Sequence, residues 1–334
     1  MSLRKKKRRV FEIEGNLVKP SERKRFSIGA TSLFDFTELG IPVEVIRGNE
    51  PGPVLFISGA IHGDEINGVE IIRKLLRRKE LSQIKGTIIA IPIINVFGFN
   101  NKSRYLPDGR DLNRSFPGSK EGSQAGRMAY MLMNEVVKKS THGIDFHTGA
   151  LHRTNLPQIR AFMEDEKTRS MAKAFDAPLI LNSSLRDGSL REAARKRKIP
   201  MLLFEGGEAL RFDENVIKIG VRGCINVMRS IGMLPPALKK RDKEAYIAQS
   251  SHWVRAPHGG CLRLKKKLGE AVSKGDILGV ISDPFDRERI EVLSRSNGVV
   301  IGLSLIPLVN RGDAIIHIGA PDKNTDKDGI DYLD

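Results

Sequence analysis

Between residues 53 and 205, short aliphatic runs alternate with longer segments in which apolar residues recur every three or four positions. The short runs predict strands at 54–58, 87–95, 143–148, 159–163, 179–181 and 201–205. The helical spacing is carried by Val69, Ile72, Leu75 and Leu76 in one segment, and by Ala125, Ala129, Leu132 and Val136 in another. Such alternation predicts an α/β fold, in which helices flank a mostly parallel or mixed sheet.

A change of composition follows the stretch "GMLPP" at 232–236, where the chain becomes highly charged and then rich in short β runs separated by glycine turns. Closely spaced turns of this kind are typical of an antiparallel β domain. The predicted units are an N-terminal basic arm and lead-in segment, a catalytic domain, a charged connector, a barrel-like all-β domain and a polar tail, at 1–48, 49–236, 237–251, 252–320 and 321–334.

The net charge of +16 is partly local, because residues 1–25 hold ten Lys or Arg against three Glu, a net +7. Blocks of like charge are often solvated tails, so the segment is either a disordered arm or a docking site for an acidic protein partner. The remaining charge can steer an anionic substrate. A nucleic-acid partner is disfavoured, because the basic runs lack interleaved aromatic residues.

No membrane span is expected, since the longest apolar runs fall short of the ~20 residues that one needs. The N-terminal charges precede no apolar segment, so the chain does not begin like a secretory signal, and we expect a cytoplasmic protein. The two cysteines, Cys224 and Cys261, have no metal-type or redox-type spacing. A homo-oligomer is compatible with the sequence.

The stretch "ISGAIHGDEINGVE" places His62 and Glu65 three positions apart, directly after a predicted strand. A solvated loop is one interpretation, because acidic residues favour helix starts. The other is a metal site, because side chains about one turn apart face a common point. The second interpretation requires another ligand elsewhere.

Other polar residues lie where predicted strands end, at the edge where open α/β sheets bind ligands. His147 ends "GIDFH" and Glu205 ends "PMLLFE", while a long polar loop spans 103–118. His142 and His152 compete with His147, and Glu208 competes with Glu205. We prefer His147 and Glu205, because each directly terminates an apolar run.

Two imidazoles and a carboxylate are typical ligands of catalytic zinc, which keeps a fourth position open. A further carboxylate such as Glu205 can transfer protons. Arginine stabilises an oxyanion, and an Asn-Arg pair can bind a substrate carboxylate. Arg104, Asn113 and Arg114 are the candidates for these roles, although the loop arginines could also be surface charges.

Four motifs in order, "GAIHGDE", "GRDLNRSFPG", "DFHTG" and "FEGGE", resemble the succinylglutamate desuccinylase/aspartoacylase family over roughly residues 50–235. The resemblance implies a zinc carboxypeptidase-like fold and one Zn²⁺ per chain. It implies the following roles: His62, Glu65 and His147 as zinc ligands, Glu205 as general base, Asn113 and Arg114 in substrate binding, and Arg104 or Arg110 at the oxyanion.

The implied activity is a zinc-dependent amidohydrolase that removes the acyl group from a small anionic N-acyl amino acid. A carboxypeptidase or isopeptidase acting on acidic peptides is the alternative enzyme, and a non-catalytic scaffold that binds an acidic partner is the alternative of another class. Residues 256–318 resemble a biotinyl/lipoyl-type barrel. Its hairpin region "SDPFDRERIEV" has no lysine to carry a cofactor, so we expect a covering module.

Overall fold

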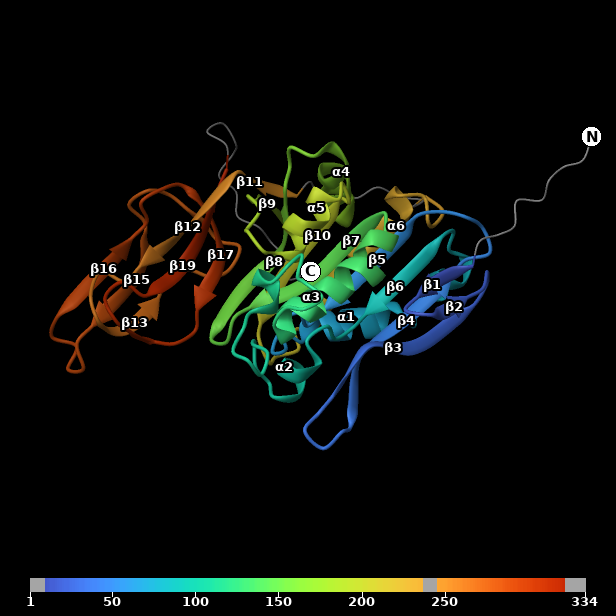
Figure 1. Cartoon of the computed structure of the whole chain (residues 1–334). Coiled ribbons are helices and arrows are strands. Elements are labelled where there is room, and N and C mark those ends of the chain that lie inside the picture. Colours follow the sequence, from blue (N-terminus) through green and yellow to red (C-terminus); the bar gives the residue numbers. More distant parts are fainter. Residues whose placement is uncertain (1–9, 237–244, 322–334) are drawn as a thin grey trace, which may run out of the picture.

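The computed structural model describes residues 10–236 and 245–321. Within them, thirteen strands form one mixed sheet, whose longest path runs β12-β19-β17-β8-β10-β7-β5-β6-β4-β3. Helices cover both faces of its central part, and a second β layer lies at one end (Figure 1). The predicted α/β fold with a C-terminal antiparallel β region is therefore confirmed.

The centre of the sheet is parallel, as the aliphatic runs predicted. It consists of β5 (Val54–Gly59), β6 (Thr87–Ile91), β7 (His142–Gly149) and β10 (Met201–Glu208). β6 ends earlier than the predicted 87–95, because Pro92 has no amide hydrogen for a ladder. Parallel strands end at a common edge, so the segments that follow β5, β7 and β10 meet there.

Helices pack on the two faces of this centre. On one face lie α1 (Asn67–Leu75), α4 (Glu166–Phe175) and α6 (Glu214–Ser230), whose apolar sides form one core with the sheet. A second core contains the apolar side of α3 (Gln124–Glu135) and residues of α5 (Leu190–Lys196), beside α2 (Val96–Asn100). Short 3-10 turns occupy Lys79–Gln83, Leu112–Arg114 and Val137–Lys139. No helix in the described ranges is long and apolar enough to cross a membrane.

The segment assigned to the arm and lead-in contains four strands: β1 (Phe11–Ile13), β2 (Asn16–Val18), β3 (Arg23–Ser32) and β4 (Glu38–Arg47). β4 pairs with β6 and so extends the main sheet. Ile13 and Val18 are fully buried, and the amide of Glu14 donates to Glu135 of α3. From residue 10 onward this part of the chain packs on the catalytic domain; residues 1–9, with most of the basic run, lie outside the described residues.

The C-terminal β region is continuous with the main sheet through β8 (Arg153–Ala161). One edge of β8 pairs with β10. On the other edge, the first residues of β8 pair with β17 and the last residues of β8 pair with β9. The remaining strands are β9 (Leu179–Asn182), β11 (Tyr246–Ala248), β12 (Ser250–Arg255), β13 (Gly260–Leu264), β14 (Ala271–Val272), β15 (Ile277–Ser282), β16 (Arg289–Leu293), β17 (Gly298–Ser304), β18 (Leu308–Val309) and β19 (Ala314–Ala320).

The connector and tail are described in part. β11, which lies inside the predicted connector 237–251, pairs in parallel with β9. Residues 237–244 of the connector and 322–334 of the predicted tail lie outside the described residues. Through β11, the described end of the connector thus joins the C-terminal region to the catalytic sheet at a second place, besides the pairing of β17 with β8.

Candidate metal centre and active site

His62 and Glu65 lie in the tight turn that joins β5 to α1, and both are almost fully buried. Gly63 between them approaches α2 so closely that a Cβ would lie 2.0 Å from the carbonyl carbon of Gly98. Only glycine fits this packing without a backbone shift. The turn therefore presents both polar side chains inward, at the edge where the parallel strands end.

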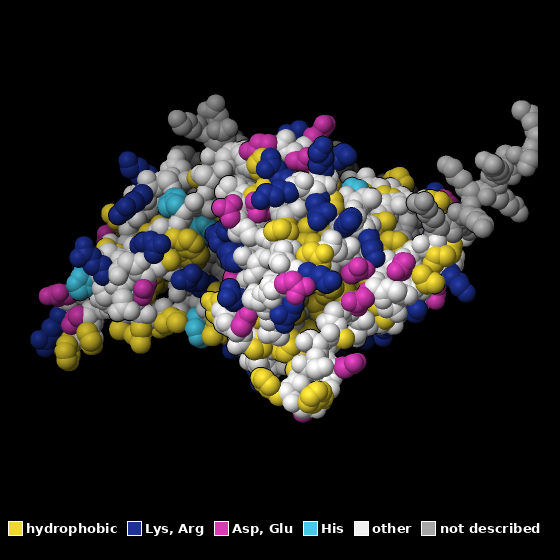
Figure 2. All heavy atoms as spheres, in the orientation of Figure 1, with side chains coloured by type: hydrophobic (Ala, Val, Ile, Leu, Met, Phe, Trp, Pro, Cys, Tyr) yellow, Lys and Arg dark blue, Asp and Glu magenta, His cyan; other side chains and the backbone are white. Residues whose placement is uncertain are grey.

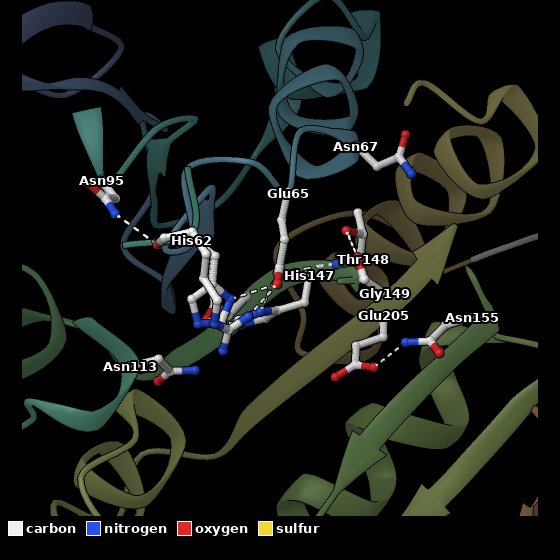
Figure 3. A network of polar contacts seen from close by, with 12 residues as sticks. His62, Glu65, Asn67, Asn95, Asn113, His147, Thr148, Gly149, Asn155 and Glu205 are labelled. Carbon is white, nitrogen blue, oxygen red and sulfur yellow. Dashed lines mark hydrogen bonds and ion pairs between the residues drawn. The ribbon is translucent and has the colours of Figure 1, made fainter. Parts of the chain in front are cut away.

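Glu65 lies between two imidazoles (Figure 3). Its Oε1 is 2.7 Å from Nδ1 of His62, and its Oε2 is 2.7 Å from Nδ1 of His147. One ligand atom from each of the three residues lies within 4.8 Å of the others. The structure thus brings the three predicted ligands into one buried group.

A second carboxylate holds the far nitrogen of each ring. Nε2 of His62 is 3.2 Å from Asp111, and Nε2 of His147 is 2.9 Å from Asp145. Asp145 also accepts a hydrogen bond from Ser58 at 2.7 Å. Such carboxylate–histidine pairs fix the ring orientation and raise the basicity of metal-binding imidazoles.

Electrostatics in this group favour a positive charge at its centre. Burial by itself lowers the pKa of His147, but Glu65 and Asp145 outweigh burial and raise it to about 10. Burial likewise lowers the pKa of His62, and Glu65 and Asp111 raise it above the ordinary value. Burial raises the pKa of Glu65, but the two imidazoles bring it well below the usual range.

The residues therefore fit a divalent metal ion. Two imidazole nitrogens and a carboxylate converge, the outer nitrogens are held, and the local field favours a cation. This donor set is the one that zinc takes in hydrolytic sites. His142 and His152 take no part: His142 lies at the opposite end of β7 from His147, and the side chain of His152 is 55% exposed.

Arg104 lies beside the three ligands, and Arg110 does not. Arg104 contacts Glu65 at 3.1 Å and Asp111 at 2.9 Å. Arg110 is 63% exposed, and its charged contact is Asp108 at 3.5 Å. The cavity beside His62, Glu65 and His147, which we call the metal group, is lined by Arg104 but not by Arg110.

Asn113 and Arg114 also line this cavity. The Oδ1 atom of Asn113 accepts a hydrogen bond from the amide of Leu190 at 2.9 Å, which fixes the amide group at the start of α5. Arg114 is exposed, and its guanidinium donates to the carbonyl of Asn113 at 2.6 Å. The pair is positioned as one unit on the rim of the cavity.

Glu205 stands in the cavity, opposite His147 in the register of β10 and β7. Paired residues on neighbouring parallel strands point to the same face, so its carboxylate is directed to the metal group's side of the sheet. Glu208 lies outside the cavity, where it accepts a hydrogen bond from the amide of His152 at 3.0 Å. The geometry therefore separates the two rival carboxylates.

The cavity has a volume of about 770 Å³ and extends from the metal group to the C-terminal β region. Lys and Arg side chains lie on both sides of the junction with that region (Figure 2). The part of the cavity wall away from the metal is rich in arginine; we call it the arginine end and define it by Arg153, Arg160, Arg186 and Arg191.

Arg191 is 7% exposed, and one of its guanidinium nitrogens donates to Ser183 and to the carbonyl of Ser184. Among the described residues, nothing accepts a hydrogen bond from Nη1. Burial, and then the charges of Arg160 and Arg186, lower the pKa of Arg191 to about 10. Buried donors of this kind carry a desolvation cost, which an anion in the cavity would remove.

Trp253 and His317 of the C-terminal region close the arginine end. Their rings stack with centroids 4.6 Å apart, and the Arg153 guanidinium lies 5.1 Å from the Trp253 ring. Burial, and then the charge of Arg160, lower the pKa of His317 to about 3, so this imidazole is neutral near pH 7. The C-terminal region thus supplies part of the cavity wall.

Most residues around the predicted ligands were not predicted from the sequence. Asp145 had a detectable signal, because it lies two positions before His147 on the same strand and so shares its face. Asp111 lies inside the quoted loop motif without having been singled out. Trp253 and His317 had no local signal, since they come from strands about a hundred or more residues beyond His147.

Comparison with known proteins gives a consistent result. The family profile described as the succinylglutamate desuccinylase/aspartoacylase catalytic domain matches residues 51–231. An N-alpha-acetyl-L-2,4-diaminobutyric acid deacetylase of Halomonas elongata is 29% identical over 292 residues, which cover 82% of this chain and 84% of the relative.

Solved structures extend the similarity to the whole fold. A succinylglutamate desuccinylase/aspartoacylase from Rhodobacter sphaeroides matches with a TM-score of 0.77 and 26% identity, over 89% of this chain and 95% of that one. The product-bound ectoine utilization protein of Ruegeria pomeroyi matches with a TM-score of 0.79 and 25% identity, over 90% and 97%.

The profile match covers more than half of the chain, and it contains both histidines and the glutamate of the buried group. These relatives include deacylases of N-acyl amino acids, which the motifs had implied. This chain belongs to the succinylglutamate desuccinylase/aspartoacylase family.

Proposed function

We propose that the protein is a zinc-dependent amidohydrolase that hydrolyses the amide bond of a small anionic N-acyl amino acid. The observation that carries the proposal is the buried His62–Glu65–His147 group in a cavity that Glu205 also lines. Relatives that carry deacetylase and desuccinylase names support an amide bond as the target.

His62, Glu65 and His147 would hold one Zn²⁺ per chain. Bound zinc supplies Lewis acidity, which polarises a carbonyl and makes water a stronger acid. Asp111 and Asp145 keep the outer ring nitrogens occupied, so that each histidine presents Nδ1 to the centre. Both carboxylates thereby set the orientation of the ligands.

Glu205 is the proposed general base and acid. It would accept the proton of the attacking water and return it to the nitrogen of the leaving amine, a type of assistance worth about 10²–10⁴ in rate. Arg104 would donate hydrogen bonds to the oxygen on which negative charge develops. Both side chains line the cavity that contains the metal group.

Substrate charge is the next part of the proposal. The Nδ2 group of Asn113 and the guanidinium of Arg114 would bind the free carboxylate of the amino acid, for which a planar fork is suited. The arginine end favours a further negative group, because Nη1 of the buried Arg191 has no hydrogen-bond acceptor among the residues that the structure describes. We therefore propose an anionic substrate for this chain.

A carboxypeptidase or isopeptidase acting on acidic peptides is the second candidate. It is favoured by one observation, the cavity volume of about 770 Å³, which exceeds the needs of a small acyl amino acid. The assembled polar site disfavours the scaffold alternative, because buried charged groups are costly and are usually retained for chemistry.

Matched substrates test the proposal. Purified zinc-loaded protein is assayed on a panel of N-acyl amino acids, on their α-carboxamides, and on acidic peptides of two to four residues. We expect turnover of the free acids, weak turnover of the carboxamides, and little cleavage of peptides. In the Arg114→Lys variant, kcat/KM should fall on free acids with little further loss on carboxamides.

Equal cleavage of the free acid and the carboxamide would refute carboxylate binding by Asn113 and Arg114, and the peptidase would become the leading hypothesis. Absence of turnover on every substrate, with zinc bound, would instead favour a non-catalytic role. The exposed Arg110→Lys variant is the control, because its guanidinium lies outside the cavity.

A further inference from the structure

In the described part of the chain, the carboxylate of Glu205 is held through one of its two oxygens. Its Oε2 accepts a hydrogen bond from Nδ2 of Asn155 at 2.7 Å and an ion-pair contact from Arg160 at 3.0 Å. No hydrogen bond to Oε1 occurs within the described part of the chain. Figure 3 shows one oxygen directed to Asn155 and the other away from it.

Both holding residues lie on β8, at positions that flank Glu205 across the sheet. Glu205 is opposite Gln158 in the antiparallel register, Asn155 is opposite Gly207, and Arg160 is opposite Leu203. Glu205 therefore has its two partners on the diagonals, a spacing that long side chains can bridge. A register shift between Glu205 and Gly207 adjusts the approach of Asn155.

Asn155 also contacts the C-terminal β region. It is opposite Gly302 of β17, and a Cβ on Gly302 would lie 2.8 Å from Oδ1 of Asn155 and 3.2 Å from Cβ of His317. The nearest backbone atom would be Thr154 O at 3.6 Å, which is an ordinary contact. A methyl group on Gly302 would therefore displace the Asn155 amide, and it would also press on Cβ of His317, which moves only with β19.

We propose that Asn155 and Arg160 are positioning residues that orient Glu205 through Oε2 and leave Oε1 as its working oxygen, and that Gly302 keeps Asn155 in place. The C-terminal β region then acts on the general base through β8, besides covering the cavity. This inference rests on the proposed function for its kinetic consequence, but the contacts themselves are independent of any substrate.

The first test is kinetic: a double-mutant cycle of Gly302→Ala and Asn155→Leu is measured on the substrate of the panel with the highest turnover. Each single change should lower kcat by roughly tenfold or more, with KM and zinc content unchanged, because a small misplacement of a reacting group is costly. Gly302→Ala should add nothing in the Asn155→Leu background. If the kcat losses of the two single variants multiplied in the double variant, Gly302 would not act through Asn155.

The second test measures stability and does not depend on enzyme activity. Melting temperatures are measured for Asn155→Leu and Arg160→Met, each alone and in a Glu205→Leu background. Each change should lower the melting temperature less when the carboxylate is gone, because the donors then have no partner to lose. Additive losses of melting temperature would refute the proposal that Asn155 and Arg160 hold Glu205, whichever substrate the enzyme cleaves.

Gly259→Ala serves as the control for the C-terminal region, since a Cβ there meets nothing closer than 3.5 Å. It should leave kcat and the melting temperature unchanged. If the wild-type protein turned over no substrate but the melting shifts were non-additive, the proposed function would be refuted and the positioning of Glu205 by Asn155 and Arg160 would be supported. If it turned over substrate but the melting shifts were additive, the proposed function would be supported and the positioning role would be refuted.

Discussion

The two ends of the cavity, the metal end at the buried His62–Glu65–His147 group and the arginine end, are both charged, but they are built in opposite ways. At the metal end, each imidazole contacts two carboxylates, as His147 does with Glu65 and Asp145. At the arginine end, the buried Arg191 lies near further arginines, and its Nη1 has no acceptor within residues 10–236 and 245–321. One end therefore attracts a cation and the other an anion.

Glu205 lies between the two ends. It is opposite His147 in the sheet, and it contacts Arg160 of the arginine end. A substrate with a negative group would thus be oriented by the arginine end, with its amide toward the metal and the base. In the proposed function, metal binding at one end of the cavity is therefore separated from substrate recognition at the other.

The largest effect is expected from breaking the metal end. His62→Ala should remove stoichiometric zinc and reduce deacylase activity to background, because two remaining ligands do not make a zinc site. Elemental analysis of the purified protein measures the zinc. His152→Ala is the matched control, since this exposed histidine is not part of the group. Full zinc occupancy in His62→Ala would show that the ligand assignment is wrong.

Glu205→Gln tests the position between the ends. The amide is nearly isosteric but cannot transfer the proton, so kcat should fall by about 10²–10⁴ while zinc stays bound. Steady-state kinetics and metal analysis are compared with those of Glu208→Gln, whose carboxylate lies outside the cavity. If Glu205→Gln kept more than a tenth of the wild-type turnover, the role would move to Glu208.

Asp145→Asn weakens the metal end without removing a ligand. Loss of the negative charge behind His147 should reduce zinc affinity roughly 10- to 100-fold, as expected for outer partners of ligating histidines. Competition with a chelator measures the affinity. Asp108→Asn is the control, because this residue pairs with the exposed Arg110. Equal affinities in the two variants would argue against a metal on His147.

The smallest effect concerns the arginine end. Arg191→Met should raise KM about tenfold for substrates with a second negative group, because one charge-assisted hydrogen bond is lost. Neutral substrates should be unaffected. Arg197→Met, at the exposed end of α5, is the control. An equal rise of KM on neutral substrates would mean that Arg191 supports the structure of the wall instead of selecting charge.

Local pattern was enough to predict the metal end. His62 and Glu65 stand one turn apart after an aliphatic strand, and His147 and Glu205 terminate two further strands. Since parallel strands end at one edge, position along the chain translated directly into proximity. The arginine end had no such rule, because its residues come from β8, the segment before α5, and the C-terminal region.

The boundaries of the units show the same division. Residues 1–48 were assigned to a basic arm and lead-in segment, yet β4 within them pairs with β6 and joins the main sheet. The C-terminal β pattern was recognised, but its junction with β8 was not. Strand pairing between distant segments depends on which sheet edges remain open, and periodicity within one segment contains no information about that.

The sequence by itself determined the strands and helices of the catalytic domain, the motifs at the strand ends and the nature of the buried His-Glu-His group. Only the tertiary structure showed that Arg104, and not Arg110, contacts the His-Glu-His group, that Asp111 lies against His62, and that Asn155, Arg160 and Gly302 lie around Glu205. The physical reason is range: propensity and periodicity act over a few residues, whereas these contacts join side chains through the pairing of strands far apart in the chain.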